Sequence, residues 1–229
     1  GADVRAVEIE RHGLQSAFTV LRPGRGAPLP VVLNLPGRHN VLNSLAAITV
    51  ATELGIDDAA IQRALAKFQG VDRRLQLVGS VPVGGTEVAI IDDYGHHPTE
   101  IAAVLAAARA SAPARIVVAF QPHRYSRTAQ LMPEFAAALA AADEVVLTDI
   151  YPASEAPIPG VTVDALAEAV NRRRTTPVVV ARTLDAVPAA VADLAREGDL
   201  VITLGAVSIG HLPAAVLHEI EARGKGGAS

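Results

Sequence analysis

The stretch "IIDDYGHHPTEI", from Ile90 to Ile101, passes from an apolar run into two aspartates, a tyrosine and two histidines. The run that contains its start, "VAIID", is short, rich in Val and Ile and apolar on both faces, which is typical of a strand covered by helices on both sides. Pro98 suits the first position of a helix, and Glu100 suits its first turn. The stretch therefore predicts a buried strand, a polar turn and a helix.

The same alternation continues to the end of the chain. Four more short apolar runs, each followed by a helical pattern, occupy residues 115–121, 144–150, 177–181 and 199–205. Strands and helices that alternate in this way predict an α/β fold with right-handed crossovers and an open, mostly parallel sheet. Ligands bind beyond the carboxyl ends of such strands. The turns "DDYGHH", "QPHRYSRT" and "GAVSIG" are expected at that edge.

The first part of the chain has a different pattern. "VRAVEIERHGLQSAFTVLRPG" predicts a hairpin, "PVVLNLPG" a further strand, and two helical stretches follow before the glycine-containing segment that ends near Arg74. We place a domain boundary there, with residues 1–74 and 75–229 as separate domains. The first piece is short and rich in edge strands, so we interpret it as the tail of a larger domain.

Composition restricts the class of protein. The chain has 229 residues, of which 50% are hydrophobic, and a formal net charge of −4. No basic excess is available to neutralise phosphates, which argues against nucleic acid as a partner. The absence of cysteine excludes a disulfide framework, a thiol nucleophile and a Cys-ligated metal, and it fits a cytoplasmic protein. No apolar run long enough to span a membrane is present, so no membrane association is expected.

The turn "DDYGHHP" supports three interpretations. Asp93 at a strand end in a nucleotide-binding sheet commonly accepts hydrogen bonds from ribose hydroxyls, and the helix start that follows is a natural anion site. Alternatively, the aspartates stabilise the turn while His96 and His97 are solvated. A zinc site is the third interpretation, with ligands drawn from Asp92, Asp93, His96, His97 and His123, although no metal-site signature matches this spacing.

The turn "QPHRYSRT" gathers positive charge at the end of the next strand. His123, Arg124 and Arg127 place an imidazole and two permanent cations in one loop. Arginine binds carboxylates and phosphates through two parallel hydrogen bonds, which suits an acidic substrate. Pairing with surface carboxylates is the alternative, and the neighbouring "DDYGHH" turn favours binding.

Three other segments contain residues that are suited to chemistry or ligand binding. "GAVSIG" (Gly205–Gly210) resembles a nucleophile elbow, but Ala206 replaces its first glycine and no aspartate follows Ser208, so a small-residue turn near an anion is preferred to a serine hydrolase. Asn40 and Asn43 lie three residues apart at a helix start, where Asn40 suits an N-cap. "VDRRLQ" supplies Arg73 and Arg74 at the domain junction. The chain contains neither a G-x-x-x-x-G-K-[ST] loop nor a G-x-G-x-x-G turn.

Five motifs in order, "LPGRHNVLNSLAAI", "GVDRRLQ", "IIDDYGHHPTEI", "FQPHRYSRT" and "DEVVLTDIYPASE", resemble the Mur ligase family of peptidoglycan synthesis. Within it they resemble the branch that joins L-alanine to UDP-N-acetylmuramate more than the murein-tripeptide recycling branch. The resemblance runs from about Pro36 to Gly210. It implies the end of a central ATPase domain followed by a whole C-terminal Rossmann-like domain, with the N-terminal domain and the rest of the central domain upstream.

The resemblance also implies an activity. The family uses ATP and Mg²⁺ to activate the muramyl carboxylate as an acyl phosphate, which the amine of L-alanine then attacks to form an amide. The lysine loop that binds ATP and the magnesium ligands of the family precede the matched segment, so no metal ligand is assigned to this chain. We expect the chain by itself to be inactive. The alternative is a non-catalytic nucleotide- or anion-binding Rossmann-like module.

Residue roles follow from the same resemblance. Asn40 and Asn43 would contact the adenine, Asp93 would hold the ribose with Tyr94 beside it, and Arg74 would reach the phosphates. His96, His123, Arg124 and Arg127 would position L-alanine and the substrate carboxylates. Arg74, His96, Arg124 and Arg127 are the catalytic candidates, and their work is orientation and charge neutralisation, since an arginine does not give up its proton.

The last strand departs from the family. The family pattern there is Gly-Ala-Gly, whereas this chain has Gly205-Ala206-Val207. Valine disfavours positive φ and blocks a close backbone approach. A valine is therefore expected to impair closure on a ligand if the family's glycine is needed for it.

Overall fold

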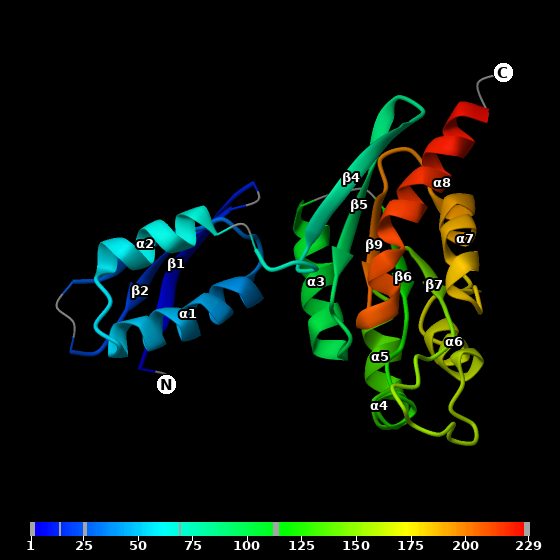
Figure 1. The fold of residues 1–229 in the computed structure, drawn as a ribbon, viewed down its shortest axis with the longest axis horizontal. Coiled ribbons are helices and arrows are strands. Elements are labelled where there is room, and N and C mark those ends of the chain that lie inside the picture. Colours follow the sequence, from blue (N-terminus) through cyan, green and yellow to red (C-terminus); the bar gives the residue numbers. More distant parts are fainter. Residues whose placement is uncertain (1–2, 14, 25–26, 69, 112–114, 227–229) are drawn as a thin grey trace. The chain divides into compact units, whose positions relative to one another are not determined.

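A computed structural model describes residues 3–13, 15–24, 27–68, 70–111 and 115–226. The chain separates into two compact units, residues 1–71 and 72–229 (Figure 1). The division falls just before Arg73 and Arg74, so both arginines are part of the second unit. Each unit is described by itself.

The first unit is a three-stranded antiparallel sheet with two helices. It consists of β1 (Arg5–His12), β2 (Gln15–Leu21), β3 (Leu29–Leu33), α1 (Arg38–Glu53) and α2 (Asp58–Lys67). Buried and exposed side chains alternate along β2 and β3, so one sheet face forms a core with the helices. The predicted hairpin, strand and helices are confirmed.

The second unit is a six-stranded sheet in the order β4-β5-β9-β6-β7-β8. Its elements are, in chain order, β4 (Gln76–Val83), β5 (Thr86–Asp93), α3 (Pro98–Ser111), β6 (Ile116–Phe120), α4 (Tyr125–Gln130), α5 (Met132–Leu139), β7 (Glu144–Leu147), α6 (Val163–Asn171), β8 (Val179–Val180), η1 (Leu184–Ala186), α7 (Val187–Leu194), β9 (Leu200–Leu204), η2 (Val207–His211) and α8 (Pro213–Gly226). Five strands are parallel and β4 is antiparallel to β5. The predicted α/β fold with a mostly parallel sheet is confirmed.

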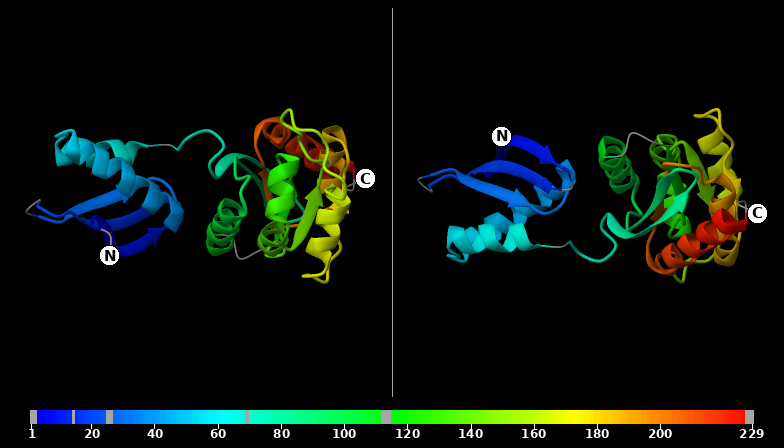
Figure 2. Two further views of the ribbon diagram at one scale, coloured as in Figure 1. Left: turned by 90° about the horizontal axis from the view of Figure 1, so that it is seen from below. Right: turned by 90° about the horizontal axis from the view of Figure 1, so that it is seen from above.

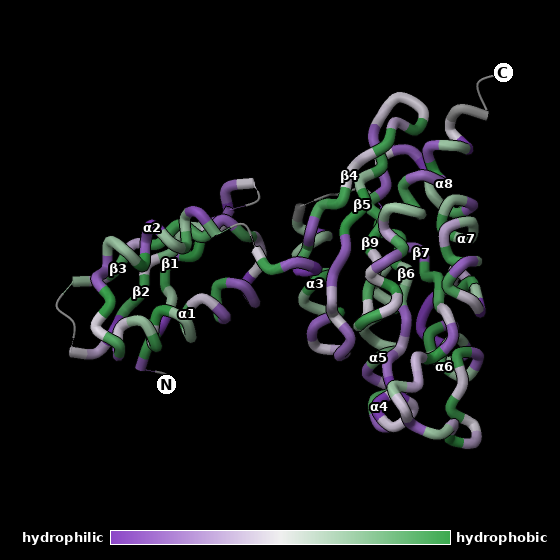
Figure 3. The backbone as a smooth tube through the Cα atoms, viewed as in Figure 1, coloured by the Kyte–Doolittle hydropathy of each residue, from purple (hydrophilic) through white to green (hydrophobic). Residues whose placement is uncertain are grey.

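Helices cover both faces of this sheet (Figure 2). The side chains of α3, α5 and α6 pack on one face with alternate residues of β6 and β9, and those of α7 and α8 pack on the other. Strands buried on both sides must be apolar throughout. Green, the colour of hydrophobic residues, accordingly dominates the parallel strands in Figure 3.

Three local predictions are corrected. The strand β4 was not predicted, although Gly84-Gly85 before an apolar run is a hairpin signal. The helical pattern of the sequence from Arg127 to Asp143 predicts a single helix, but the structure divides it into α4 and α5 at Leu131, because Pro133 occupies the first turn of a new helix. A glycine after a helical pattern predicts a helix end at Gly198 and at Gly224, but α7 ends earlier, at Leu194, and α8 continues to Gly226.

A buried ion pair lies at the amino edge of the sheet. The Nε and Nη2 atoms of Arg115 donate to the two carboxylate oxygens of Asp199 at 3.0 and 2.9 Å, and Nη2 also donates to the Leu194 carbonyl. The Asp199 side chain is only 1% exposed. Loss of the arginine would leave a buried carboxylate without its cation.

Arg115→Met should therefore destabilise the second unit by about 3 kcal/mol, because methionine keeps the apolar stem but removes the charge that Asp199 requires. Denaturant titration of the free energy of unfolding measures the change. Arg172→Met is the matched control, since Arg172 is 70% exposed and its contact with Glu168 is 3.9 Å long. An equal effect of the two substitutions would contradict the prediction.

Candidate functional site at the carboxyl edge of the sheet

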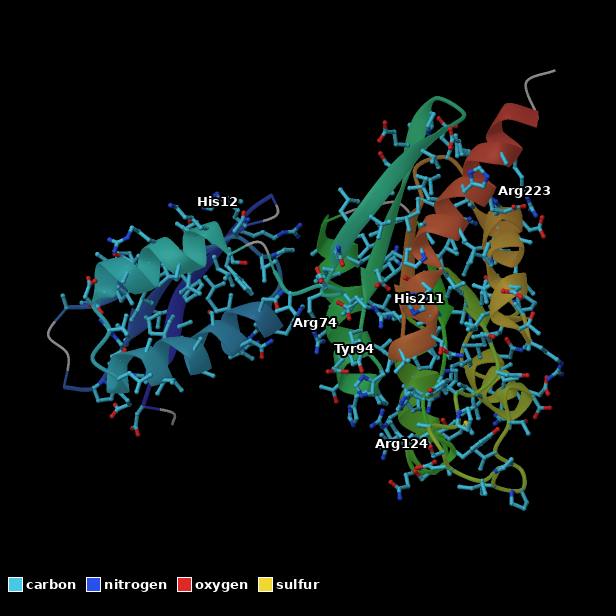
Figure 4. All side chains as sticks on the ribbon, in the orientation of Figure 1. His12, Arg74, Tyr94, Arg124, His211 and Arg223 are labelled. Carbon is cyan, nitrogen blue, oxygen red and sulfur yellow. The ribbon has the colours of Figure 1, made fainter. Side chains whose placement is uncertain are left out.

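Four parallel strands end in one row. The register pairs Asp93 with Leu204, Leu204 with Phe120, and Phe120 with Leu147. The turns that follow β5, β9, β6 and β7 therefore leave the sheet side by side, although they are far apart in the sequence. Figure 4 shows Arg74, Tyr94 and Arg124 toward this end of the unit.

Asp93 supports the turn in this structure. The residue is 1% exposed, and its two carboxylate oxygens accept hydrogen bonds from the backbone N–H groups of Leu75 and Gly95 at 2.8 and 2.7 Å. Burial raises the pKa of Asp93 above its ordinary value, while these hydrogen bonds and the charge of Arg74 act in the opposite direction. The interpretation of a turn held by an aspartate describes this geometry, and a ribose contact stays a prediction.

Asp92 belongs to a clamp built around Arg73. One carboxylate oxygen of Asp92 accepts a hydrogen bond from Arg73 Nε at 2.7 Å, and the other accepts one from Thr203 Oγ1 on β9, also at 2.7 Å. Arg73 further donates to the carbonyls of Gly205 and Val207 and lies 5.0 Å from the centre of the Tyr94 ring. One guanidinium thus ties together the turns after β5 and β9.

The start of α3 is occupied by the protein's own carboxylate. Glu100 accepts hydrogen bonds from the backbone N–H groups of His96 and His97, and its carboxylate lies 3.6 Å from His96 Nδ1 and 3.6 Å from Arg74 Nη1. This arrangement corrects the prediction of an anion site at this helix terminus, because Glu100 already fills it.

The charge of Glu100 is favoured in the folded state. Burial raises the pKa of Glu100, but the two backbone hydrogen bonds and the positive charges of His96 and Arg74 outweigh burial and hold that pKa below its ordinary value. Glu100 therefore places Arg74 and His96 relative to each other at the edge of the sheet.

Aromatic rings connect the first turn to the second. The ring centres of Tyr94 and His96 are 5.3 Å apart, and those of His96 and His123 are 5.9 Å apart, both edge to face. The structure thus brings together Tyr94, His96 and His123 from two separate turns. His97 is exposed, and its Nδ1 accepts the N–H of Thr99 at the helix start.

The second turn presents two side-chain nitrogens that lack partners among the described residues. Among the described residues, His123 Nδ1 and Arg127 Nη1 are buried without any hydrogen bond. Burial lowers the pKa of His123, and the positive charges of Arg127, His96 and Arg124 lower it further, so the neutral imidazole is favoured. Buried polar atoms are normally satisfied. A carboxylate or phosphate would supply the acceptor that Arg127 lacks.

The donors proposed for zinc are arranged for other contacts. Asp92 and Asp93 are turned into the protein, where both oxygens of each already accept hydrogen bonds. Over the part of the chain that the structure describes, no group of three His, Asp or Glu side chains is placed to hold a metal ion. The described helices also include none long and apolar enough to cross a membrane.

The two asparagines lie in the first unit. Asn40 is buried, and its Nδ2 donates to the Pro36 carbonyl at 2.8 Å, whereas Asn43 is exposed. The N-cap expected at Asn40 is wrong, since α1 is capped at Gly37 without a side-chain hydrogen bond. The adenine contact implied for Asn40 and Asn43 stays a prediction.

The segment after β9 contains a strained valine. Gly205 has φ 138°, and a side chain there would collide with the Gln121 carbonyl at 2.8 Å. Val207 has φ 59° and is 46% exposed. A β-branched residue is a genuine outlier in this left-handed region. The predicted conflict between valine and positive φ is therefore present, and the carbonyl of Val207 is held by Arg73.

Two residues of this edge, Arg73 and Glu100, have more contacts than their sequence patterns predict. Arg73 was considered only as a charge near the junction, and Glu100 only as a helix-dipole residue. The spacing of His97 and Glu100, three residues apart before an apolar run, resembles a capping box and was a usable signal. No nearby sequence pattern indicates the contacts of Arg73, because its partner Gly205 lies 132 residues further along the chain.

Comparisons with known proteins agree with this architecture. Residues 73–207 match the family described as "Mur ligase, glutamate ligase domain". UDP-N-acetylmuramate–L-alanine ligases of Burkholderia thailandensis and Burkholderia cenocepacia are each 51% identical, over 97% and 96% of this chain. The alignments cover 48% of each relative, so the chain spans about half the length of the curated relatives it matches.

The chain also superposes on solved structures of related ligases. The UDP-N-acetylmuramate-alanine ligase of Thermotoga maritima superposes with a TM-score of 0.77 at 27% identity, covering 96% of this chain and 46% of the other. A murein peptide ligase of Psychrobacter arcticus superposes with a TM-score of 0.67 at 24% identity, covering 96% of this chain and 44% of the other. The second match shows the fold alone.

Val207→Gly should stabilise the second unit by about 1 kcal/mol, because glycine adopts positive φ without strain, and this gain exceeds the extra entropy of the unfolded chain. Denaturant titration measures it. Val78→Gly is the matched control: Val78 is 38% exposed, lies in β4, and is not among the positive-φ residues. The control should destabilise, and a destabilising Val207→Gly would contradict the argument.

Glu100→Gln should change the pH dependence of stability. Because the folded-state pKa of Glu100 lies below its unfolded value, its charge stabilises the fold above the unfolded pKa, and this stabilisation is lost as pH falls through the folded value. The difference in unfolding free energy between parent and variant should be largest near neutral pH and should shrink as the pH falls below the ordinary pKa of a glutamate.

The exposed Glu168→Gln on α6 is the control, and it reports pH effects that do not depend on Glu100. A difference between parent and Glu100→Gln that stays constant over the acid range would show that the Glu100 charge does not favour folding.

Proposed function

The chain belongs to the Mur ligase family, and on that premise we propose that it supplies the amino-acid side of an ATP-dependent ligase that joins L-alanine to UDP-N-acetylmuramate. Curated relatives named UDP-N-acetylmuramate–L-alanine ligase are 50% and 51% identical to the chain. The reaction builds the first peptide bond of the peptidoglycan precursor, which is made in the cytoplasm. The first unit, residues 1–71, would be the tail of the central ATPase domain, and the second unit, residues 72–229, the C-terminal Rossmann-like domain.

The observation that carries the proposal is a pair of buried side-chain nitrogens after β6 that lack hydrogen-bond partners among the described residues. His123 Nδ1 and Arg127 Nη1 are buried without partners among the described residues. The Arg124 side chain is exposed, and the described residues provide it with no hydrogen bond or ion pair. A ligand with a carboxylate would satisfy such donors, and both L-alanine and the muramyl group carry one.

In the proposed reaction, these residues would bind and orient the substrates and would not transfer protons. The terminal phosphoryl group of ATP passes to the muramyl carboxylate, giving an acyl phosphate and ADP, and the amine of L-alanine then displaces phosphate to form the amide. Arg124 and Arg127 would hold carboxylate groups and offset negative charge. His96 and His123, fixed edge to face, would orient the amino acid. Correct orientation alone lowers a barrier substantially.

The nucleotide would meet a different set of residues. Asn40 and Asn43 would contact the adenine, Asp93 and Tyr94 would lie near the ribose, and Arg74 would reach the phosphates. Asp93 is buried and bonded to the backbone, so its part in this set requires a change in the turn. Mg²⁺ would be held mainly by residues outside this chain, and it would neutralise the phosphate charge.

We expect the full-length gene product to release ADP only when both L-alanine and UDP-N-acetylmuramate are present, because the amine and the carboxylate react at one site. The 229-residue chain alone should bind ATP weakly and release no ADP. A coupled ADP assay measures both. ADP release by the isolated chain would contradict the proposal that ATP is bound mainly by residues outside it. ATP or anion binding without ligation by the full-length protein would favour the non-catalytic binding module.

Arg127→Ala, measured in the same ADP-release assay, tests whether Arg127 contributes to the binding site. Removal of the guanidinium, whose Nη1 atom is buried, should reduce ADP release by on the order of tenfold or more, because the carboxylate loses its cation. Arg172→Ala, an exposed arginine at the end of α6, is the matched control and should retain parent activity.

A further inference from the structure

The segment after β7, residues 149–155, reaches the cationic turn but has no role in the proposed function. Tyr151 N–H donates to the Pro122 carbonyl at 2.9 Å, and Arg124 N–H donates to the Tyr151 carbonyl at 2.8 Å. These bonds form an isolated parallel bridge between His123 and Tyr151. The pairing of β6 with β7 is thus extended beyond the strand ends, into the site.

The Tyr151 side chain stacks on the ring of His123. The two rings are stacked, with centres 5.3 Å apart and planes 19° apart, while His96 meets His123 edge to face on another side. His123 Nδ1 has no hydrogen bond within the described residues. The imidazole is therefore held by contacts with the Tyr151 and His96 rings, since no hydrogen bond at Nδ1 fixes it.

The end of the same segment supports the helix that carries Arg127. Both oxygens of Glu155 accept hydrogen bonds from Ser126, one from the backbone N–H at 2.9 Å and one from Oγ at 2.6 Å. Glu155 reaches this position through a turn in which Ala153 and Ser154 have φ values of 49° and 70°. Two non-glycine residues in the left-handed region are costly, and such a turn persists only when its surroundings impose it.

We propose that Tyr151 is a positioning residue that acts through His123 to shape the amino-acid site, with Glu155 holding the start of α4 at the same time. The inference rests on the proposed function for its kinetic consequence but not for its structural content. Tyr151 is half-buried and lies outside the hydrophobic core clusters, so filling of the core does not explain it. An aliphatic side chain of similar volume would pack but could not stack.

Proton NMR of the histidine rings in the 229-residue chain tests the structural part. The His123 Cε1–H signal, assigned by its loss in His123→Gln, should lie upfield because the tyrosine ring shields it. Tyr151→Phe keeps the ring and should keep that shift, whereas Tyr151→Leu should move the signal downfield. Ile158→Ala, at an exposed position farther along the chain, is the control and should leave the shift unchanged. An unchanged His123 signal in Tyr151→Leu overturns the proposal.

Kinetics of the full-length gene product test the functional part. Tyr151→Leu should raise the KM for L-alanine by on the order of tenfold with a smaller change in kcat, because a displaced imidazole weakens the placement of the amino acid. Glu155→Ala should raise the same KM, and Tyr151→Phe should stay within about twofold of the parent. Thermal unfolding of each variant confirms that the fold is retained.

The NMR and kinetic measurements together distinguish failure of the positioning role of Tyr151 from failure of the proposed function. An unchanged KM in Tyr151→Leu despite a shifted His123 signal means that the stack is packing alone, which overturns the positioning role. A parent protein that releases no ADP overturns the proposed function instead, and the NMR comparison still decides whether Tyr151 holds His123.

Discussion

The site depends on the register of the parallel sheet. Since β9 lies between β5 and β6, and the pairing ends Asp93, Leu204, Phe120 and Leu147 in one row, four turns emerge at the same level. A shift of one residue in any strand would reverse which side chains face the helices and would separate the turns. The burial of both sheet faces makes such a shift prohibitive, so the hydrophobic layers are what align the polar edge.

The polar groups at this edge divide into two kinds. Asp92, Asp93 and Glu100 are saturated by contacts within the protein, and they fix the backbone of the turns and the position of Arg74. His123 Nδ1 and Arg127 Nη1 are left without partners in the described part of the chain. The acidic residues thus act as internal supports, while the His123 and Arg127 nitrogens remain available to a ligand. This division agrees with a site that binds carboxylates.

Arg73 explains how a strained turn persists beside this site. Its guanidinium bonds to Asp92 and to the carbonyls of Gly205 and Val207, and a Cβ on Gly210 would lie 2.4 Å from its Cζ atom. The same group that tolerates no side chain at Gly210 holds Val207 at positive φ. Several charge-assisted hydrogen bonds together can offset the cost of one unfavourable backbone angle.

The sequence by itself determined the alternation of strands and helices, the mostly parallel sheet, and the turns in which Tyr94, His96, His123, Arg124 and Arg127 would meet, because hydrophobic periodicity and chain connectivity are local properties. Only the tertiary structure decided which way each side chain turns. Asp93 faces the backbone of Leu75, Arg73 reaches a carbonyl 132 residues away, and Tyr151 stacks on His123. These contacts depend on strand order and register, which no short stretch of sequence encodes.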